Sequence, residues 1–146
     1  MTEERRYIDF EVVKERWNVY ELEDGTKLKT RNTLRSVWVE TDSLGAVAYH
    51  CDIHNMRVVL CHTSKQGEKD QTPHTPSQLM ENIEKRVCRY ETMSYEASEY
   101  TLDNNVGIVF HLNLNRISRT SLFDPKGDRI YLSDLRSSRV LYLPNT

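Results

Sequence analysis

The stretch WNVYELEDGTKLKTR, residues 17–31, predicts a β-hairpin and indicates a fold built from antiparallel strands. Two runs of mixed apolar and polar residues flank the turn sequence Glu23-Asp24-Gly25. Three loop residues that end in glycine are typical of a type I turn followed by a residue in the left-handed conformation. We expect the second strand of this hairpin to run from Lys27 to Val39 and to bend near Asn32.

The length of the turn also sets which residues face each other across this hairpin. The expected pairs are Glu21 with Lys27, Tyr20 with Leu28, and Trp17 with Arg31. Directly opposed side chains on one face interact, so this register predicts one ion pair and one cation–π contact on the outer face.

Short runs with strand-like alternation predict the remaining strands. In chain order they cover residues 7–13, 46–53, 56–62, 99–102, 106–117, 129–132 and 139–143. Turn sequences separate them, notably Asp42 to Gly45 and Asp124 to Gly127. The two strands at 46–62 are expected to form a hairpin around His54-Asn55. Alternation in 106–117 places four apolar residues on one face: Ile108, Phe110, Leu112 and Leu114.

One segment carries a helical pattern. Thr75, Pro76 and Gln78 form a capping box with proline at the first helical position. Four apolar residues then recur at helical spacing, namely Leu79, Ile83, Val87 and Tyr90. They predict one amphipathic helix near residues 76–90 that is buried through this stripe. The preceding segment, residues 63–74, has no apolar residue and is expected to be a mobile polar loop.

The chain of 146 residues fits a single domain, residues 1–146, without a clear internal repeat. Its fold class is mainly β (α+β). Many short strands predict a small barrel or a strongly curved antiparallel sheet with the one helix beside it. Because sheet edges must be closed or paired, a barrel or a dimer is favoured over an open sheet.

Net charge, apolar run lengths and cysteine spacing indicate which partners and which cellular compartment to expect. The net charge of −2 is unlike that of dedicated nucleic-acid binders, and no apolar run is long enough to span a membrane. The charged N-terminus does not resemble a signal peptide. Three cysteines without a CxxC pattern favour reduced thiols and a cytoplasmic location.

Two segments together carry a family resemblance. YIDFEVVKERWNVYELEDGTKLKTRNTL, residues 7–34, resembles the opening of a short, uncharacterised, mainly archaeal β-protein family, in which a WN-x-Y-x-L-x-DGT hairpin leads into a strand. LNLNRISRTSLFDPKGDRIYL, residues 112–132, resembles its second half. Residues 37–111 depart from that pattern. The resemblance implies a β fold and no activity.

Histidines and cysteines gather around residues 50–62. They are His50, Cys51, His54, Cys61 and His62, with Cys88 and His111 elsewhere. Neighbouring strand residues point to opposite faces, so only His50 and Cys61 share a face diagonally in the expected hairpin. Zinc needs about four converging ligands. We therefore predict no metal site.

The same hairpin offers the one candidate for catalysis. A thiol nucleophile needs a nearby base and a group that orients the base. His50, Asp52 and Cys61 share a face and could supply these three roles in a small hydrolase or thiol enzyme. No glycine-rich phosphate loop is present, and no cofactor is predicted.

A strand face with four basic residues is a further candidate binding site. Four cations fall at odd positions of one strand: Lys27, Lys29, Arg31 and Arg35. Alternate strand residues are roughly 6.6–6.8 Å apart, close to the phosphate spacing of a single nucleic-acid strand. Trp17 and Tyr20 lie nearby and could stack on bases.

Three functions remain open on this sequence. The leading interpretation is a non-enzymatic binding or assembly module that acts through a β surface, as a homo-oligomer or with a protein partner. Single-stranded nucleic-acid binding through the basic face is the first alternative. An enzyme around His50, Asp52 and Cys61 is the second.

Overall fold

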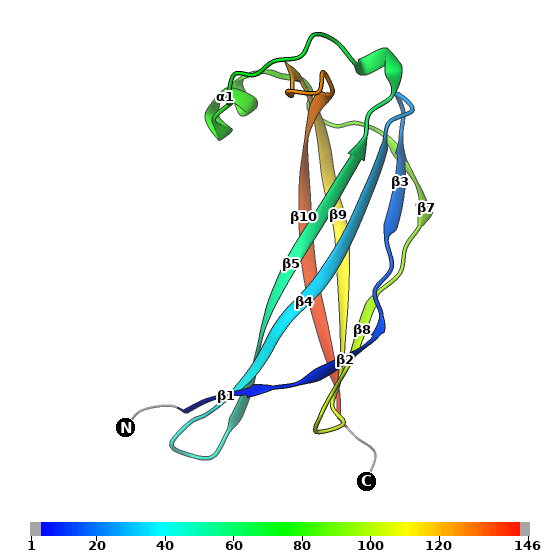
Figure 1. The fold of residues 1–146 in the computed structure, drawn as a ribbon. Coiled ribbons are helices and arrows are strands. Elements are labelled where there is room, and N and C mark those ends of the chain that lie inside the picture. Colours follow the sequence, from blue (N-terminus) through cyan, green and yellow to red (C-terminus); the bar gives the residue numbers. More distant parts are fainter. Residues whose placement is uncertain (1–3, 144–146) are drawn as a thin grey trace.

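A computed structural model of the chain describes residues 4–143 and consists of two five-stranded antiparallel sheets (Figure 1). Sheet A contains β1 (Glu4–Ile8), β3 (Asn18–Leu22), β4 (Lys27–Thr41), β5 (Val47–Leu60) and β7 (Tyr90–Ser94). Sheet B contains β2 (Phe10–Lys14), β6 (Ile83–Lys85), β8 (Ser98–Leu102), β9 (Gly107–Phe123) and β10 (Arg129–Tyr142). The mainly β fold is confirmed. The sheets do not close into the barrel that was one expected form.

Two long hairpins form the frame of the molecule. β4 pairs with β5 along one edge, while its other edge takes β3 at one end and β1 at the other. β9 is arranged in the same way, with β10 along one edge and β8 and β6 on the other. The two hairpins lie against each other in Figure 1.

The two halves of the chain are copies of one structural unit. The β3–β4 register of Tyr20 with Leu28 recurs in β8–β9 as Tyr100 with Ile108, a shift of 80 positions. β4–β5 and β9–β10 match in the same way, and each contains a register irregularity at the equivalent place. The expectation of no internal repeat was wrong.

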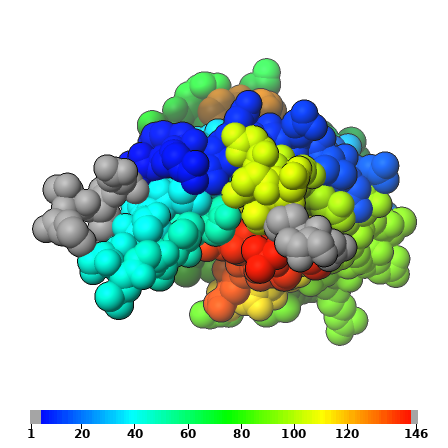
Figure 2. All heavy atoms as spheres, turned by 90° about the horizontal axis from the view of Figure 1, so that it is seen from below, coloured from blue at the N-terminus to red at the C-terminus, as the bar shows by residue number. Residues whose placement is uncertain are grey.

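The halves also exchange a strand. β2 pairs with β8 of the second half, and β7 pairs with β3 of the first half in the equivalent register. Because β1 belongs to sheet A and β2 to sheet B, the chain crosses between the sheets at Asp9. In Figure 2 the blue N-terminal residues lie across both the cyan and the yellow-green parts of the molecule.

Two apolar cores follow from this symmetry. The first is centred on Val37, Ile108 and Phe110, and the second on Leu28, Leu114 and Ile117. Val37 and Ile117 are equivalent residues, and both are fully buried. The predicted inward face of residues 106–117 is confirmed, because all four of its apolar residues are buried. Each core contains strands from both halves, so neither half encloses its core alone.

The register of the first predicted hairpin is confirmed, but the expected ion pair is wrong, because neither Glu21 nor Lys27 forms an ion pair within residues 4–143. Glu21 pairs with Lys27 and Tyr20 with Leu28. Gly25 has a φ of 86°, as the left-handed turn position requires. The Arg31 guanidinium carbon lies 4.4 Å from the Trp17 ring centroid, which is the expected cation–π contact. The irregularity in β4 falls next to Arg35, slightly beyond the expected bend.

The predicted helix over 76–90 was wrong in length. Thr75 and Gln78 form the expected capping box, but α1 (Pro76–Glu81) ends at Asn82 and contains no buried residue. The chain continues as β6 and β7 because β9 and β3 each present a free edge there. Val87, expected in the buried stripe, is 59% exposed.

Three strand boundaries also differ from expectation. Residues 46–53 and 56–62 do not form a hairpin, since β5 is one continuous strand paired with β4. Residues 129–132 and 139–143 are likewise parts of the single strand β10. The expected strand over 7–13 is divided at Asp9 between the two sheets.

The segment 63–74 crosses the β9–β10 turn and bonds to it. After the short 3-10 helix η1 (Thr63–Lys65), the Gly67 N–H donates to the Gly127 carbonyl at 2.9 Å. The Asp70 N–H donates to the Asp124 carbonyl at 3.1 Å. These contacts lead us to expect an ordered segment, and mobility stays a prediction to test. None of the described helices is both long and apolar enough to cross a membrane.

Candidate functional site

The most distinctive surface of the described residues is the seam between β5 and β10. Each strand has 14 residues, and each pairs with a neighbour on one side only. Their other edges face each other, so the seam carries two long rows of backbone groups without a partner strand. Such edges are ready to pair with a further strand.

Side chains bridge the seam. The Arg139 guanidinium donates to the Tyr49 carbonyl at 2.8 Å and lies 3.4 Å from the Cys51 sulfur. Further along, the Ser137 hydroxyl lies 3.3 Å from Asn55 Oδ1. These contacts join the edge strands through side chains, and the bond from Arg139 occupies one backbone group of the β5 edge, the Tyr49 carbonyl.

A layer of buried polar residues lies behind the seam, where the two cores meet. Asn18 donates to the Leu112 carbonyl at 3.3 Å, and Ser98 donates to the Asn32 carbonyl at 3.4 Å. These two bonds are equivalent under the internal symmetry. Asn32, 2% exposed, leaves its Nδ2 without a partner among the described residues. The centre of the molecule is therefore polar.

The three residues of the catalytic hypothesis do not come together. His50 and Cys61 lie on the order of 30 Å apart, because a continuous strand rises about 3.3 Å per residue. The His50 ring stacks on Trp38, and Asp52 forms an ion pair with Arg35 at 2.9 Å. Burial raises the pKa of the Cys61 thiol, which disfavours the nucleophilic thiolate.

The side chains that could bind a metal ion are dispersed as well. Within residues 4–143 no group of three or more His, Cys, Asp or Glu side chains could hold a metal ion. All three cysteines are free thiols. The hairpin register on which the His/Cys cluster depended does not exist.

The basic face is only partly available. Lys27 is exposed and Lys29 half-buried, and neither forms an ion pair with the described residues. Arg31 is stacked on Trp17, and Arg35 is held by Asp52. Tyr20, expected beside this face, is 3% exposed and packs in the second core, so it cannot stack on a base.

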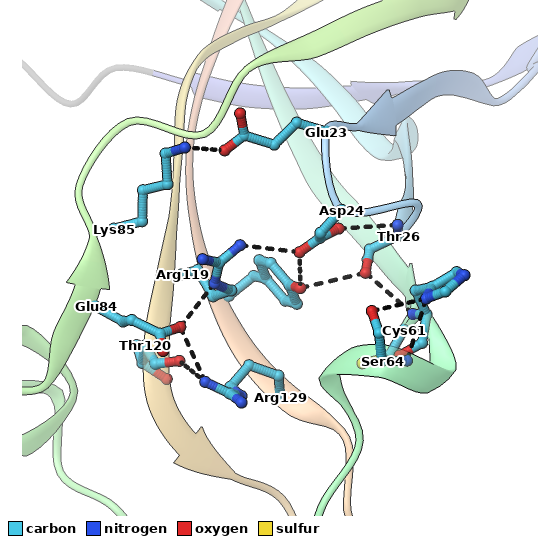
Figure 3. A network of polar contacts seen from close by, with 12 residues as sticks. Glu23, Asp24, Thr26, Cys61, Ser64, Glu84, Lys85, Arg119, Thr120 and Arg129 are labelled. Carbon is cyan, nitrogen blue, oxygen red and sulfur yellow. Dashed lines mark hydrogen bonds and ion pairs between the residues drawn. The ribbon is translucent and has the colours of Figure 1, made fainter.

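A buried ionic network lies near the β3–β4 turn (Figure 3). The Asp24 side chain is only 5% exposed and accepts hydrogen bonds from the Thr26 N–H, the Tyr131 hydroxyl and Arg119. Burial raises the pKa of Asp24, but these hydrogen bonds outweigh it and hold the pKa below its usual value. Burial and the bond to Asp24 raise the pKa of Tyr131. The charges in this network are compensated internally.

The network bonds to both ends of the segment that connects the two halves, near His62 and near Glu84. At the start of the connection the His62 N–H donates to the Thr26 hydroxyl at 3.0 Å. At its end, Glu84 accepts from Arg119 at 2.7 Å and from Arg129 at 2.9 Å. Sequence patterns did not single out this network, since its members are scattered over the chain.

The symmetry-related end of the molecule has no such ions among the described residues. There Asn104 of the second half donates to the Tyr49 hydroxyl of the first half at 3.0 Å, in the place that Asp24 and Tyr131 occupy in the network. Val39, which faces Tyr49, stands where Arg119 faces Tyr131. Only the charged end has a connecting segment to hold, so we interpret the network as structural.

Comparison of the chain with protein-family models, with curated proteins and with solved structures gives no match. The geometry of the chain itself therefore carries the functional argument.

Proposed function

We propose that the protein is a non-enzymatic assembly module in which a second copy of the chain pairs with the open edge strands β5 and β10. The seam supports this proposal. Two unpaired edges of 14 residues lie side by side, and neither strand contains a proline that would block pairing.

The internal symmetry favours a second copy as the partner. Asn55 and Ser137 are equivalent residues that contact each other, so the axis relating the halves passes through the seam. An open edge strand can pair antiparallel with its own copy about a two-fold axis, so two copies of this seam can form the closed, isologous contact that dimers use. Three free cysteines support the expectation of a cytoplasmic setting.

Hydrogen exchange combined with light scattering tests the assembly. In an edge strand, alternate N–H groups point away from the sheet and exchange rapidly in a monomer. We expect these alternate amides in Arg136–Val140 to become protected as concentration rises, together with a doubling of mass. A constant monomer mass up to about millimolar concentration, with unprotected edge amides, would refute the proposal.

Adjacent proline variants supply a matched control. One of the N–H groups of Ser137 and Ser138 points outward, and the other points toward β9. Proline at the outward position should abolish the dimer and leave the monomer's melting temperature nearly unchanged, while proline at the inward position should lower stability. A dimer that survives both variants would place the contact elsewhere than β10.

A second candidate function, single-stranded nucleic-acid binding, has one specific observation in its favour. The symmetry places Gly107, Val109 and His111 where the first half has Lys27, Lys29 and Arg31. The equivalent face of the second half thus lacks these three cations, and this basic face occurs in sheet A alone, beside Trp17. The logarithm of the affinity for a single-stranded oligonucleotide should fall linearly with the logarithm of the salt concentration. The double variant Lys27→Glu with Lys29→Glu should abolish this binding. Unchanged binding by this variant would eliminate the candidate.

A further inference from the structure

We propose that a pocket between α1 and the outer face of sheet B binds a small planar organic anion. The pocket has a volume of about 220 Å³. Met80 of α1, Ile83 of β6 and Leu132 of β10 supply apolar walls, and Arg86 and Arg116 also line it. This site is separate from the seam between β5 and β10.

The internal symmetry explains why the pocket exists. In the first half Trp38 lies opposite His50, and at the equivalent place in the second half Ser118 lies opposite Leu132. β9 is related to β4 by a shift of 80 positions and β10 to β5 by a shift of 82, and these offsets relate Trp38 to Ser118 and His50 to Leu132. Ser118 has a hydroxyl in place of an indole, and this hydroxyl donates to the Arg86 carbonyl. Ser118 is buried beneath the Arg86 backbone, and a pocket remains beside the position that the Trp38 indole fills in the first half.

The filled half shows what shape the site suits. Trp38 stacks on His50 with an interplanar angle of 14° and a centroid distance of 5.6 Å. Tyr7 lies 6.0 Å away on the same face, and the Arg5 guanidinium lies 5.1 Å from the Trp38 ring. A flat ring beside an arginine is thus the native occupant of this position in the first half.

The volume and the apolar lining of the pocket also favour a single ring as the ligand. A pocket of 220 Å³ is smaller than the roughly 300–1,000 Å³ of typical drug-sized sites, so it suits a single ring with one substituent. Leu132 stands where His50 supports the Trp38 ring and offers an apolar aliphatic contact to the ring of a ligand.

The charge of the pocket selects an anion. Arg86 and Arg116 form no ion pair with any described residue, so the pocket lining carries two arginines against one carboxylate, that of Asp134, which lies opposite Arg116 in the strand register. The one carboxylate, Asp134, accepts a hydrogen bond from Asn115 at 2.8 Å and lies 3.9 Å from Arg136. Guanidinium groups bind carboxylate and phosphate oxygens in a paired geometry. The unpaired arginines therefore favour a ligand with one of these groups.

Four probes separate the ring from the charge. We would titrate the full chain, observed by amide NMR, with phenyl phosphate, benzoate, inorganic phosphate and benzyl alcohol. Phenyl phosphate or benzoate should shift Ser118 and Leu132 saturably, and the tighter of the two identifies the anionic group. Inorganic phosphate and benzyl alcohol should each bind about tenfold or more weakly, since each lacks one determinant.

Variants then locate the site. Ser118→Trp copies the first half and should abolish binding by filling the pocket. Arg116→Gln should weaken the charged ring compounds about tenfold, whereas Arg57→Gln, which removes the same charge from the other sheet, should have no effect. If Ser118→Trp fails to fold, Arg116→Gln and Arg86→Gln decide. The proposal is overturned if no probe saturates, if benzyl alcohol binds as well as benzoate, or if Arg116→Gln behaves like Arg57→Gln.

Discussion

Ser137 and Asn55 are equivalent residues of the two halves, and their side chains contact each other with the Ser137 hydroxyl 3.3 Å from Asn55 Oδ1. A contact between equivalents marks the internal two-fold axis. The axis runs through the seam of open edges and on to the buried pair Asn18 and Ser98. The polar centre of the molecule and the seam of open edges therefore both lie on the internal two-fold axis.

The exchange of β2 and β7 should make the protein unfold as one unit. Val37→Ala in the first core and Ile117→Ala in the second should each lower the free energy of unfolding by about 2–4 kcal/mol, because both residues are fully buried. Both tryptophans lie in the first half, so fluorescence reports that half while circular dichroism reports both. Coincident transitions are expected in each variant, and separate transitions would indicate two independent halves.

Removing one partner from the buried network should lower the free energy of unfolding markedly. Arg119→Val leaves Asp24 without its cation at a site where the side chains are 13% and 5% exposed. We expect a loss of about 3 kcal/mol in urea unfolding. Adding Asp24→Asn recreates the neutral arrangement of Asn104 and Val39 at the symmetry-related end and should recover most of that loss. A double variant as unstable as the single one would show that Asp24 acts independently of Arg119.

The same carboxylate should contribute to acid sensitivity. The pKa of folded Asp24 lies below its ordinary value, so the stabilisation is complete above about pH 4 and is lost as the pH falls through the folded pKa. Asp24→Asn should therefore be less stable than the native protein at pH 7, and the difference should shrink as pH falls below 4. Melts from pH 7 to pH 3 measure it, and a difference independent of pH would contradict the assignment.

Gly67→Ala tests whether the segment 63–74 is ordered. A methyl group at Gly67 would lie 2.5 Å from the Phe123 ring, and that ring stacks under Arg129. We expect a loss of about 1–3 kcal/mol from overpacking. Glu68→Ala, an exposed neighbour, should change stability by less than about 0.5 kcal/mol. Equal, negligible effects would support a mobile loop instead.

Local signals predicted local structure well. The Asp24-Gly25 turn, the capping box at Thr75 and the alternation from Ile108 to Leu114 all depend on residues close together in the chain. The polar pair His54-Asn55 was misleading, because it has turn propensity but lies in mid-strand. Continuous pairing with β4 overrides that propensity.

Long-range pairing was beyond local patterns. β2 pairs with β8 at residues about as far apart as the length of one whole repeat, and nothing in the strand Phe10–Lys14 specifies that partner. The repeat itself leaves few identical residues, of which Tyr20 and Tyr100, two positions before Leu22 and Leu102, are the clearest. The basic face was predicted from alternation alone, which could not show that Asp52 would hold Arg35.

The strand exchange has a consequence for synthesis of the chain. As the polypeptide emerges from the ribosome, β2 is made well before its partner β8, which ends at Leu102. The first core also requires Ile108 and Phe110. β1 and β3 can pair with β4 as soon as the first half is made, whereas β2 must stay unpaired until the chain through Leu102 has been translated, and during this interval its free edges favour aggregation.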